Sequence, residues 1–215
     1  MANEILTIDE SNFLKAIETL CQRDSDLSSV VEEFGNPPFF SRPPGFATLI
    51  HIILEQQVSM ASARAAFERL KQKLEVLTPQ NFLKLDDETL KNLGFSRQKT
   101  LYSRYLADAL ERGDLNLEAF ETMTNEAVTE ELIKLKGIGR WTADIYLLMC
   151  LRRADAYPTG DLGLIVGVQT LKKLLERPTT LELEKIAAAW QPFRAVATRI
   201  IWHYYLTKIR PSKNY

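Results

Sequence analysis

Hydrophobic and polar residues follow one another along most of this chain with the period of an α-helix. From residue 46 onward, apolar and bulky side chains recur every three or four positions, at Phe46, Leu49, Ile50, Ile53, Leu54, Gln57 and Val58. The same spacing returns at Ile145, Leu148 and Met149, and again at Val196, Ile200 and Ile201. Such spacing gathers apolar side chains on one helix face. Since no stretch alternates with the period of a strand between hairpin turns, the predicted fold class is all-α.

Breaks in this pattern predict how the helices are grouped. Residues 35–45, Gly-Asn-Pro-Pro-Phe-Phe-Ser-Arg-Pro-Pro-Gly, form the clearest stretch without helical character, and shorter breaks fall at Gly94 and Gly113. We expect one compact unit of two helical lobes. Residues 46–130 would form a central bundle, and residues 1–45 plus 131–215 a second lobe. The cleft between the lobes would be the working surface.

Composition excludes several classes of function. No apolar run reaches the ~20 residues that a membrane helix needs, so we expect no membrane partner. Cys21 and Cys150 lie far apart in apolar helical patterns, which predicts free thiols. With two histidines and two cysteines in the chain, a zinc site or an iron–sulfur cluster is not expected.

Charge is distributed unevenly around a net charge of −1. Residues 1–90 carry 8 Lys and Arg against 14 Asp and Glu, whereas residues 91–215 carry 19 against 14. A basic half can supply an electrostatic footprint for a polyanion while the other half serves as scaffold. This asymmetry permits nucleic-acid binding and does not require it.

Two glycines separated by one residue mark the first candidate site. The segment reads Leu-Lys-Gly-Ile-Gly-Arg over residues 135–140, with helical patterns over 126–135 and 140–152 on either side. Glycines let a tight turn approach a phosphate, and the amides that open the second helix favour an anion. A plain helix–helix turn is the alternative. A dinucleotide loop is disfavoured, because no strand precedes the turn and the third glycine is absent.

Asp161 marks the second candidate site. It closes the constrained turn Tyr-Pro-Thr-Gly-Asp at residues 157–161, and helical spacing resumes over 162–175. Asp161 is therefore expected at a helix N-cap, a role that contributes ~1 kcal/mol by itself. The alternative is that its carboxylate acts on a group tethered by the preceding hairpin, which would be chemistry on nucleic acid.

Five ordered motifs in residues 38–208 resemble the helix-hairpin-helix (HhH-GPD) DNA glycosylases, in particular their 3-methyladenine DNA glycosylase II branch. The motifs are Ile52–Ser59 (IILEQQVS), Leu93–Lys99 (LGFSRQK), the hairpin, the Pro-Thr-Gly-Asp loop and Trp190–Arg194 (WQPFR). The resemblance implies that the backbone of Gly137, Ile138, Gly139 and Arg140 binds a DNA phosphate. A monovalent cation, Na⁺ or K⁺, would bind hairpin carbonyls. Asp161 would act on the flipped nucleotide as the catalytic residue.

The resemblance also implies a substrate pocket and groove contacts. Trp141 and Trp202 match two aromatic pocket residues of the family, and a core tryptophan on a helix is the alternative for each. Where some relatives place a pocket tyrosine, this chain has Ile145, with Tyr146 next to it. Gln56, Gln57 and Ser59 are candidate groove contacts, with a buried polar cap as the alternative. Arg194 would either orient the active site through a carboxylate or brace its helix. Arg97, Lys99 and Arg104 are candidate phosphate contacts, with a solvated helix face as the alternative.

The reaction that the resemblance implies is monofunctional. Relatives that also nick the strand carry a lysine directly after Arg140, and this chain has Trp141. We expect hydrolysis of the N-glycosidic bond of alkylated purines, 3-methyladenine and 7-methylguanine, in duplex DNA, by a monomer located in the cytoplasm of a bacterium or the nucleus of a eukaryote. The alternatives are a glycosylase for uracil, hypoxanthine or ethenoadenine, and a non-catalytic helix-hairpin-helix DNA-binding module.

Overall fold

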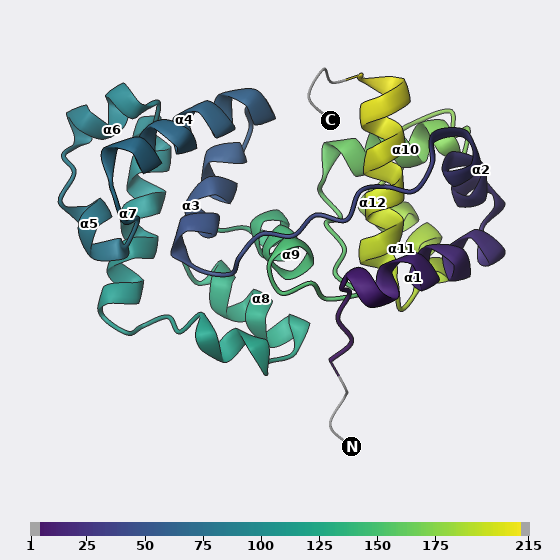
Figure 1. Ribbon diagram of the computed structural model, residues 1–215, viewed down its shortest axis with the longest axis horizontal. Coiled ribbons are helices and arrows are strands. Elements are labelled where there is room, and N and C mark those ends of the chain that lie inside the picture. The colour runs from purple at the N-terminus through teal and green to yellow at the C-terminus, as the bar shows by residue number, and fades with distance from the viewer. Residues whose placement is uncertain (1–4, 212–215) are drawn as a thin grey trace. The chain divides into compact units, whose positions relative to one another are not determined.

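The computed structural model describes residues 5–211 and confirms the all-α fold class (Figure 1). Within these residues the only extended pairing is an isolated antiparallel bridge between Thr7 and Arg153. No helix there combines the length and apolar character that crossing a membrane requires. Both cysteines are free, and Cys150 is buried.

The chain divides into two compact units. The central unit runs from Arg42 to Tyr146, and the terminal unit combines the residues up to Ser41 with those from Leu147 onward. The sequence analysis placed the boundary between the two units at residue 130. The structure instead assigns residues 131–146, which include the glycine hairpin, to the central unit. The physical reason is that the hairpin packs and hydrogen-bonds on helices of that unit, as described below.

The central unit is a set of short helices joined by tight turns. Its helices are α3 (Phe46–Glu55), α4 (Met60–Lys73), α5 (Pro79–Leu83), α6 (Asp87–Leu93), α7 (Arg97–Glu111), the 3₁₀ turn η1 (Glu118–Glu121), α8 (Asn125–Ile133) and most of α9 (Arg140–Met149). Side chains of Ser59, Thr78, Asp86, Ser96 and Thr124 cap the N-termini of α4 to α8. Each cap satisfies a backbone N–H that would otherwise lack a partner, so local sequence sets where these helices begin.

The core of the central unit forms around α3. Its side chains from Leu49 to Leu54 are almost entirely buried, apart from His51. The rings of Phe46, Phe82 and Phe95 continue this core, with centroids 5.9 Å apart in each successive pair. The predicted apolar run extended to Val58, but α3 ends at Glu55, and Val58 is 47% exposed.

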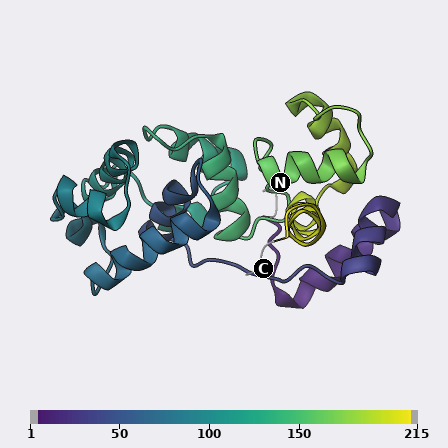
Figure 2. The ribbon, with the colours of Figure 1, turned by 90° about the horizontal axis from the view of Figure 1, so that it is seen from above.

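The terminal unit is arranged around α12. It contains α1 (Glu10–Arg23), α2 (Ser25–Phe34), α10 (Leu162–Leu171), α11 (Thr180–Ala187), the 3₁₀ turn η2 (Ala188–Trp190), α12 (Arg194–Tyr204) and a π-helical turn, η3 (Tyr205–Ile209). Figure 2 shows α12 end-on, with α1 and α2 on one side and α10 and α11 on the other. Since α12 is surrounded, its side chains Val196, Ala197, Ile200 and Ile201 are fully buried. The capping box predicted at Thr179 and Glu182 is confirmed.

A partly buried ion pair joins helices of the terminal unit that are far apart in the sequence. Asp24 ends α1 and caps α2. Lys172 Nζ lies 2.8 Å from both Asp24 carboxylate oxygens and 2.8 Å from Asp26, and Trp190 Nε1 donates to Asp24 at 2.8 Å. Burial alone would raise the pKa of Asp24, but the hydrogen bonds from Lys172 and Trp190 outweigh it and hold the pKa below 3.8.

We expect Asp24→Asn to lower the free energy of unfolding by about 1–2 kcal/mol at neutral pH, because the partly buried Lys172 ammonium loses one of its two carboxylate partners. Urea denaturation measures this loss. Because the folded-state pKa lies below the unfolded value of 3.8, the wild-type advantage is complete above that pH. It then falls as the pH drops through the lower folded-state pKa. The control is Asp26→Asn, whose 42% exposed carboxylate should contribute less than about 1 kcal/mol. Equal losses in the two variants would contradict this expectation.

Candidate active site

The hairpin of residues 136–140 is a tight turn between α8 and α9, as predicted. Gly137 adopts φ +97°, a conformation that L side chains rarely adopt. Ile138 is buried, and its N–H donates to Leu135 O at 3.0 Å, which closes the turn. Gly139 is exposed, with open space where a side chain would stand. The turn therefore presents backbone at Gly139 and the first residues of α9.

Two side chains of the central unit hold the hairpin in place. A Cβ atom on Gly137 would meet Cγ of Tyr102 at 2.0 Å, so the α7 tyrosine ring lies directly against the glycine. Gln56 Nε2 donates to Gly137 O at 2.9 Å and to Thr142 Oγ1 at 3.1 Å. The sequence analysis did not single out Tyr102, because it lies 35 positions before Gly137 and no local pattern links the two residues. Gln56 is therefore a residue that supports the hairpin.

Arg140 begins α9 and pairs along its own helix. Its Nε donates to both oxygens of Asp144, at 2.9 and 3.1 Å. The carboxylate of Asp144 is 2% exposed and the Arg140 side chain 69% exposed. The buried carboxylate thus orients a guanidinium that stays open to solvent at the helix N-terminus, where the helix dipole already favours an anion.

The turn between α3 and α4 presents Gln57 to solvent. Gln57 has φ +57°, unusual for a residue other than glycine, and its side chain is exposed like those of Val58 and Met60. Ser59 caps α4 by accepting from Ser62 N at 3.2 Å. The two glutamines of this motif therefore have different environments: Gln56 is hydrogen-bonded to the hairpin, whereas the side chain of Gln57 is exposed to solvent.

Lys99 also contributes to the α3–α4 turn. Its ammonium donates to Leu54 O, near the C-terminus of α3, at 2.6 Å. Burial lowers the pKa of Lys99 below its ordinary value. The interpretation of Lys99 as a phosphate contact is therefore replaced by a structural one, because its ammonium already holds the end of α3.

Asp161 N-caps α10 in the terminal unit. Its Oδ1 accepts the backbone N–H of Leu164 and the indole Nε1–H of Trp202, both at 2.8 Å. The Pro-Thr-Gly turn positions it, since Asp161 N donates to Pro158 O at 2.9 Å. Asp161 is half-buried and Leu162 beside it is 53% exposed. The carboxylate is thus fixed in orientation by two donors at a partly open surface.

The chain before this loop is anchored to α12. Arg194 Nε and Nη2 donate to the two oxygens of Asp155 at 2.8 and 2.6 Å, a bidentate pair. Ala195 N donates to Ala154 O at 2.9 Å. Burial raises the pKa of Tyr157, whose hydroxyl donates to Leu183 O. Of the two roles considered for Arg194, the structure favours pairing with a carboxylate that braces the loop ending at Asp161.

The predicted pocket residues differ in exposure. Trp141, in the first turn of α9, and Trp202 are half-buried. Ile145 is 5% exposed and Tyr146 is fully buried. The Tyr146 hydroxyl accepts from Gly45 N at 3.0 Å. Tyr146 is therefore a core residue of the central unit, which corrects its assignment to the pocket, and the burial of Ile145 argues for packing as well.

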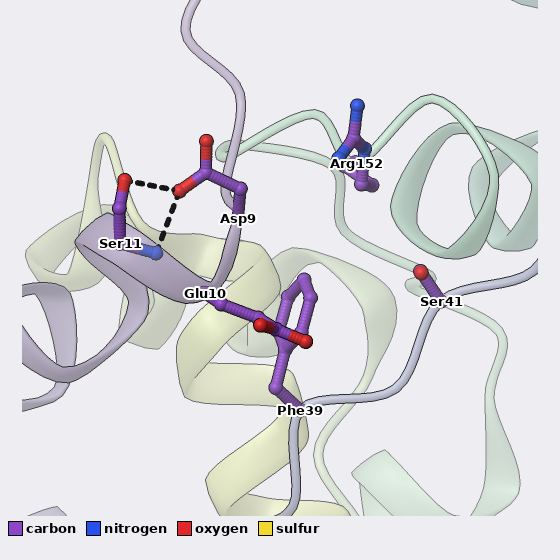
Figure 3. A pocket seen from close by; sticks show the side chains of 6 residues that line it. All are labelled: Asp9, Glu10, Ser11, Phe39, Ser41 and Arg152. Carbon is purple, nitrogen blue, oxygen red and sulfur yellow. Dashed lines mark hydrogen bonds between the residues drawn. The ribbon is translucent and has the colours of Figure 1, made fainter.

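A separate hollow of about 410 Å³ lies in the terminal unit. Its lining comprises Asp9, Glu10, Ser11, Phe39, Ser41 and Arg152 (Figure 3). None of these residues was predicted to function. Asp9 accepts hydrogen bonds from Ser11 and caps α1, so its carboxylate serves the helix.

The fold, the hairpin and the Asp161 loop define a helix-hairpin-helix protein of the DNA glycosylase type. Residues 50–192 match the HhH-GPD superfamily of base excision DNA repair proteins. Because the match covers more than half of the chain, the protein belongs to this superfamily.

Characterised relatives carry related names. DNA-3-methyladenine glycosylase 1 of Schizosaccharomyces pombe is 31% identical over 79% of this chain and 78% of its own length. A solved S. pombe 3-methyladenine DNA glycosylase in complex with abasic DNA superposes with a TM-score of 0.85, at 29% identity, covering 93% of this chain and 100% of the other. A DNA-3-methyladenine glycosidase from Bacillus halodurans gives 0.77 at 30% identity, covering 94% and 93%.

Proposed function

We propose that this protein is a monofunctional DNA glycosylase that hydrolyses the N-glycosidic bond of alkylated purines, such as 3-methyladenine and 7-methylguanine, in duplex DNA. The observation that carries the proposal is the Asp161 carboxylate, held by the Trp202 indole at 2.8 Å at the end of the Pro-Thr-Gly turn. Family membership and the names of the relatives support the same reaction. The product would be an abasic site, the first intermediate of base excision repair.

Asp161 acts on the sugar of the damaged nucleotide in this proposal. An enzyme can reach the glycosidic bond of a duplex base only after the nucleotide is flipped out of the stack. As the base departs, positive charge develops on the sugar, and a fixed carboxylate stabilises that charge or activates the attacking water. The indole N–H bond keeps the carboxylate in one orientation, so little reorganisation accompanies the reaction.

The hairpin is the proposed phosphate-binding element. The backbone at Gly139 and the N-terminus of α9 would bind a phosphate, with the exposed guanidinium of Arg140 beside it. These contacts position the duplex without reading its sequence. Ile138 anchors the turn from inside, and Gly137 supplies its left-handed conformation.

The α3–α4 turn is the proposed groove contact. Gln57 and Val58 are exposed there, and a side chain from this turn could occupy the gap that a flipped base leaves. Ser59 would contribute through its place at the start of α4, while Gln56 would act indirectly through the hairpin.

A monovalent cation at the hairpin remains a proposal. Backbone carbonyl oxygens suit a hard cation, and each has two lone pairs. Leu135 O, Gly137 O and Gly139 O accept hydrogen bonds from Ile138 N, Gln56 Nε2 and Ala143 N, and a second lone pair on such oxygens could bind Na⁺ or K⁺. When bound, the cation would add positive charge for a phosphate. Within residues 5–211, no group of three or more His, Cys, Asp or Glu side chains could hold a metal.

The absence of strand cleavage is also part of the proposal. Trp141 stands where relatives that nick DNA carry lysine, and an indole offers no amine to attack the sugar. We further propose that the protein acts as a monomer and is located with the chromosomal DNA.

The direct test is release of free bases from methylated duplex DNA, with strand breaks measured before and after alkali. We expect 3-methyladenine and 7-methylguanine to be released and breaks to appear after alkali alone. Breaks before alkali would contradict the monofunctional reaction. Release of uracil, hypoxanthine or ethenoadenine without release of methylated purines would favour another lesion, and tight duplex binding without any release would favour a non-catalytic module.

A further inference from the structure

Lys99 joins α7 to the end of α3, next to the α3–α4 turn. Its ammonium donates to Leu54 O at 2.6 Å, across 45 positions of sequence. Leu54 lies in the last turn of α3, where backbone carbonyls lack partners within the helix. That helix end carries partial negative charge and has no basic residue in its last turn. The Lys99 ammonium therefore provides both a hydrogen bond and the opposite charge.

The environment of Lys99 differs from that of its neighbours on α7. Arg97 and Gln98 are exposed, whereas Lys99 is half-buried. Within residues 5–211 no carboxylate pairs with Lys99, and burial lowers its pKa. An ammonium that loses hydration without gaining a carboxylate is unfavourable by itself. The bond to Leu54 O is therefore the interaction that explains its position.

The turn that follows α3 has an unusual backbone. Gln57 has φ +57°, a conformation that a residue other than glycine keeps only where its surroundings hold it. The chain is held on both sides of Gln57, since Gln56 is hydrogen-bonded to the hairpin and Ser59 caps α4. Lys99 adds a restraint at Leu54, three residues before Gln57. The exposed Gln57 thus belongs to a turn that is fixed at both ends.

The same part of α7 supports the hairpin. Tyr102, one turn of α7 after Lys99, packs its ring against Gly137. Gln98 Nε2 donates to the Tyr102 hydroxyl at 2.6 Å. The first two turns of α7 therefore contact both elements of the central unit for which DNA contacts are proposed, the hairpin through Tyr102 and the α3–α4 turn through Lys99.

We propose that Lys99 is a positioning residue, which binds Leu54 O and thereby holds the α3–α4 turn in the conformation that presents Gln57 to DNA. The inference rests on the proposed function, because it concerns the proposed groove contact. Lys99 acts through Gln57 and does not itself contact a phosphate. Loss of its ammonium should therefore remove the contribution of Gln57 while leaving the electrostatic part of DNA binding unchanged.

The test is a double-mutant cycle of Lys99→Met and Gln57→Ala in single-turnover release of 7-methylguanine. Each substitution alone should slow release about tenfold, and the two together also about tenfold instead of about 100-fold, because a displaced turn has already lost the Gln57 contact. Lys99→Arg, whose guanidinium can still donate to Leu54 O, should stay within about threefold of wild type. The melting temperature of Gln57→Ala should match that of wild type, so the coupling cannot arise from stability.

Salt dependence separates positioning from direct contact with DNA. A lysine that binds a phosphate of duplex DNA contributes about 0.9 to the slope of log affinity against log salt concentration. We expect Lys99→Met to keep the wild-type slope on undamaged duplex. A slope reduced by about 0.9 would identify a phosphate contact and overturn the positioning role. Additive losses in the cycle, or a wild-type release rate in Lys99→Met, would overturn it as well.

Hydrogen exchange gives a readout without DNA. The amides of residues 56–59 should exchange faster in Lys99→Met than in wild type, because the turn has lost a restraint. The control is Arg97→Met, which removes an exposed charge two positions earlier and should leave this exchange at the wild-type rate. Unchanged exchange in Lys99→Met would contradict the proposal.

Failure of the proposed function would be recognised separately. If the wild type releases no base from any duplex, the reaction is not the one proposed. The same double-mutant cycle, measured as affinity for a duplex with an abasic site relative to undamaged duplex, would still decide the role of Lys99. Coupling between Lys99→Met and Gln57→Ala in that ratio would support positioning, and additive effects would overturn it.

Discussion

Asp161→Asn is expected to slow base release at least about 1,000-fold, because it removes the charge that stabilises the developing positive charge on the sugar. The substitution suits the site, since asparagine keeps an oxygen at the position of Oδ1. That oxygen accepts from Leu164 N and Trp202 Nε1, both at 2.8 Å. Duplex affinity and melting temperature should therefore stay near wild type. Single-turnover release, fluorescence anisotropy with labelled duplex and thermal denaturation measure the three quantities.

Asp161→Ala is the matched control. It removes the charge and both accepted hydrogen bonds, so release should be lost and stability should fall by about 1 kcal/mol, the usual contribution of an N-cap. The two variants separate the electrostatic role from the cap. If Asp161→Asn released bases at the wild-type rate, the Asp161 carboxylate would only cap α10, and another residue would be the catalytic one.

Gly137→Ala is the second substitution with a large expected effect. We expect affinity for damaged and undamaged duplex to fall together by about 10- to 100-fold, equivalent to losing a charge-assisted hydrogen bond. The glycine has φ +97°, and a Cβ atom would come within 2.0 Å of the Tyr102 ring. The hairpin must therefore move away from α7, which also disturbs the bond from Gln56. Anisotropy titrations with the two duplexes measure the change.

Gly139→Ala provides the comparison, because nothing lies within 4 Å of the Cβ position at Gly139. Its melting temperature should match that of wild type, while that of Gly137→Ala should fall. Adding Tyr102→Ala to Gly137→Ala removes the clash but leaves the backbone strain, so affinity should recover only in part. Full affinity in Gly137→Ala, or loss on damaged duplex alone, would contradict a phosphate-binding hairpin.

Local patterns predicted the features that depend on local physics. The helical period predicted the fold class, the capping box at Thr179 predicted the start of α11, and the glycine spacing predicted the turn at residues 136–139. Each of these depends on residues within one or two turns of chain. Asp161 was likewise expected at an N-cap, and the structure places it there.

Contacts between distant residues could not be read from those patterns. The bond from Gln56 to Gly137 O and the Tyr102 ring against Gly137 depend on how helices pack, and they assign the hairpin to the central unit. The apolar period carried the predicted helix past Glu55 to Val58. Ser59, a good N-cap for the following helix, was the signal that the chain turns before α4.

The division of the chain has a consequence for its synthesis. All residues of the central unit are contiguous, so it can complete its core once Tyr146 has left the ribosome. The terminal unit needs α1 and α2 together with α10 to α12, which are made last. Its first two helices therefore cannot complete their packing until the C-terminal helices have been made. Until then, Leu20 and Leu27 lack the partners that bury them in the folded protein. We infer that the nascent chain forms the hairpin of residues 136–140 before the loop that ends at Asp161, since domains generally fold as units during synthesis.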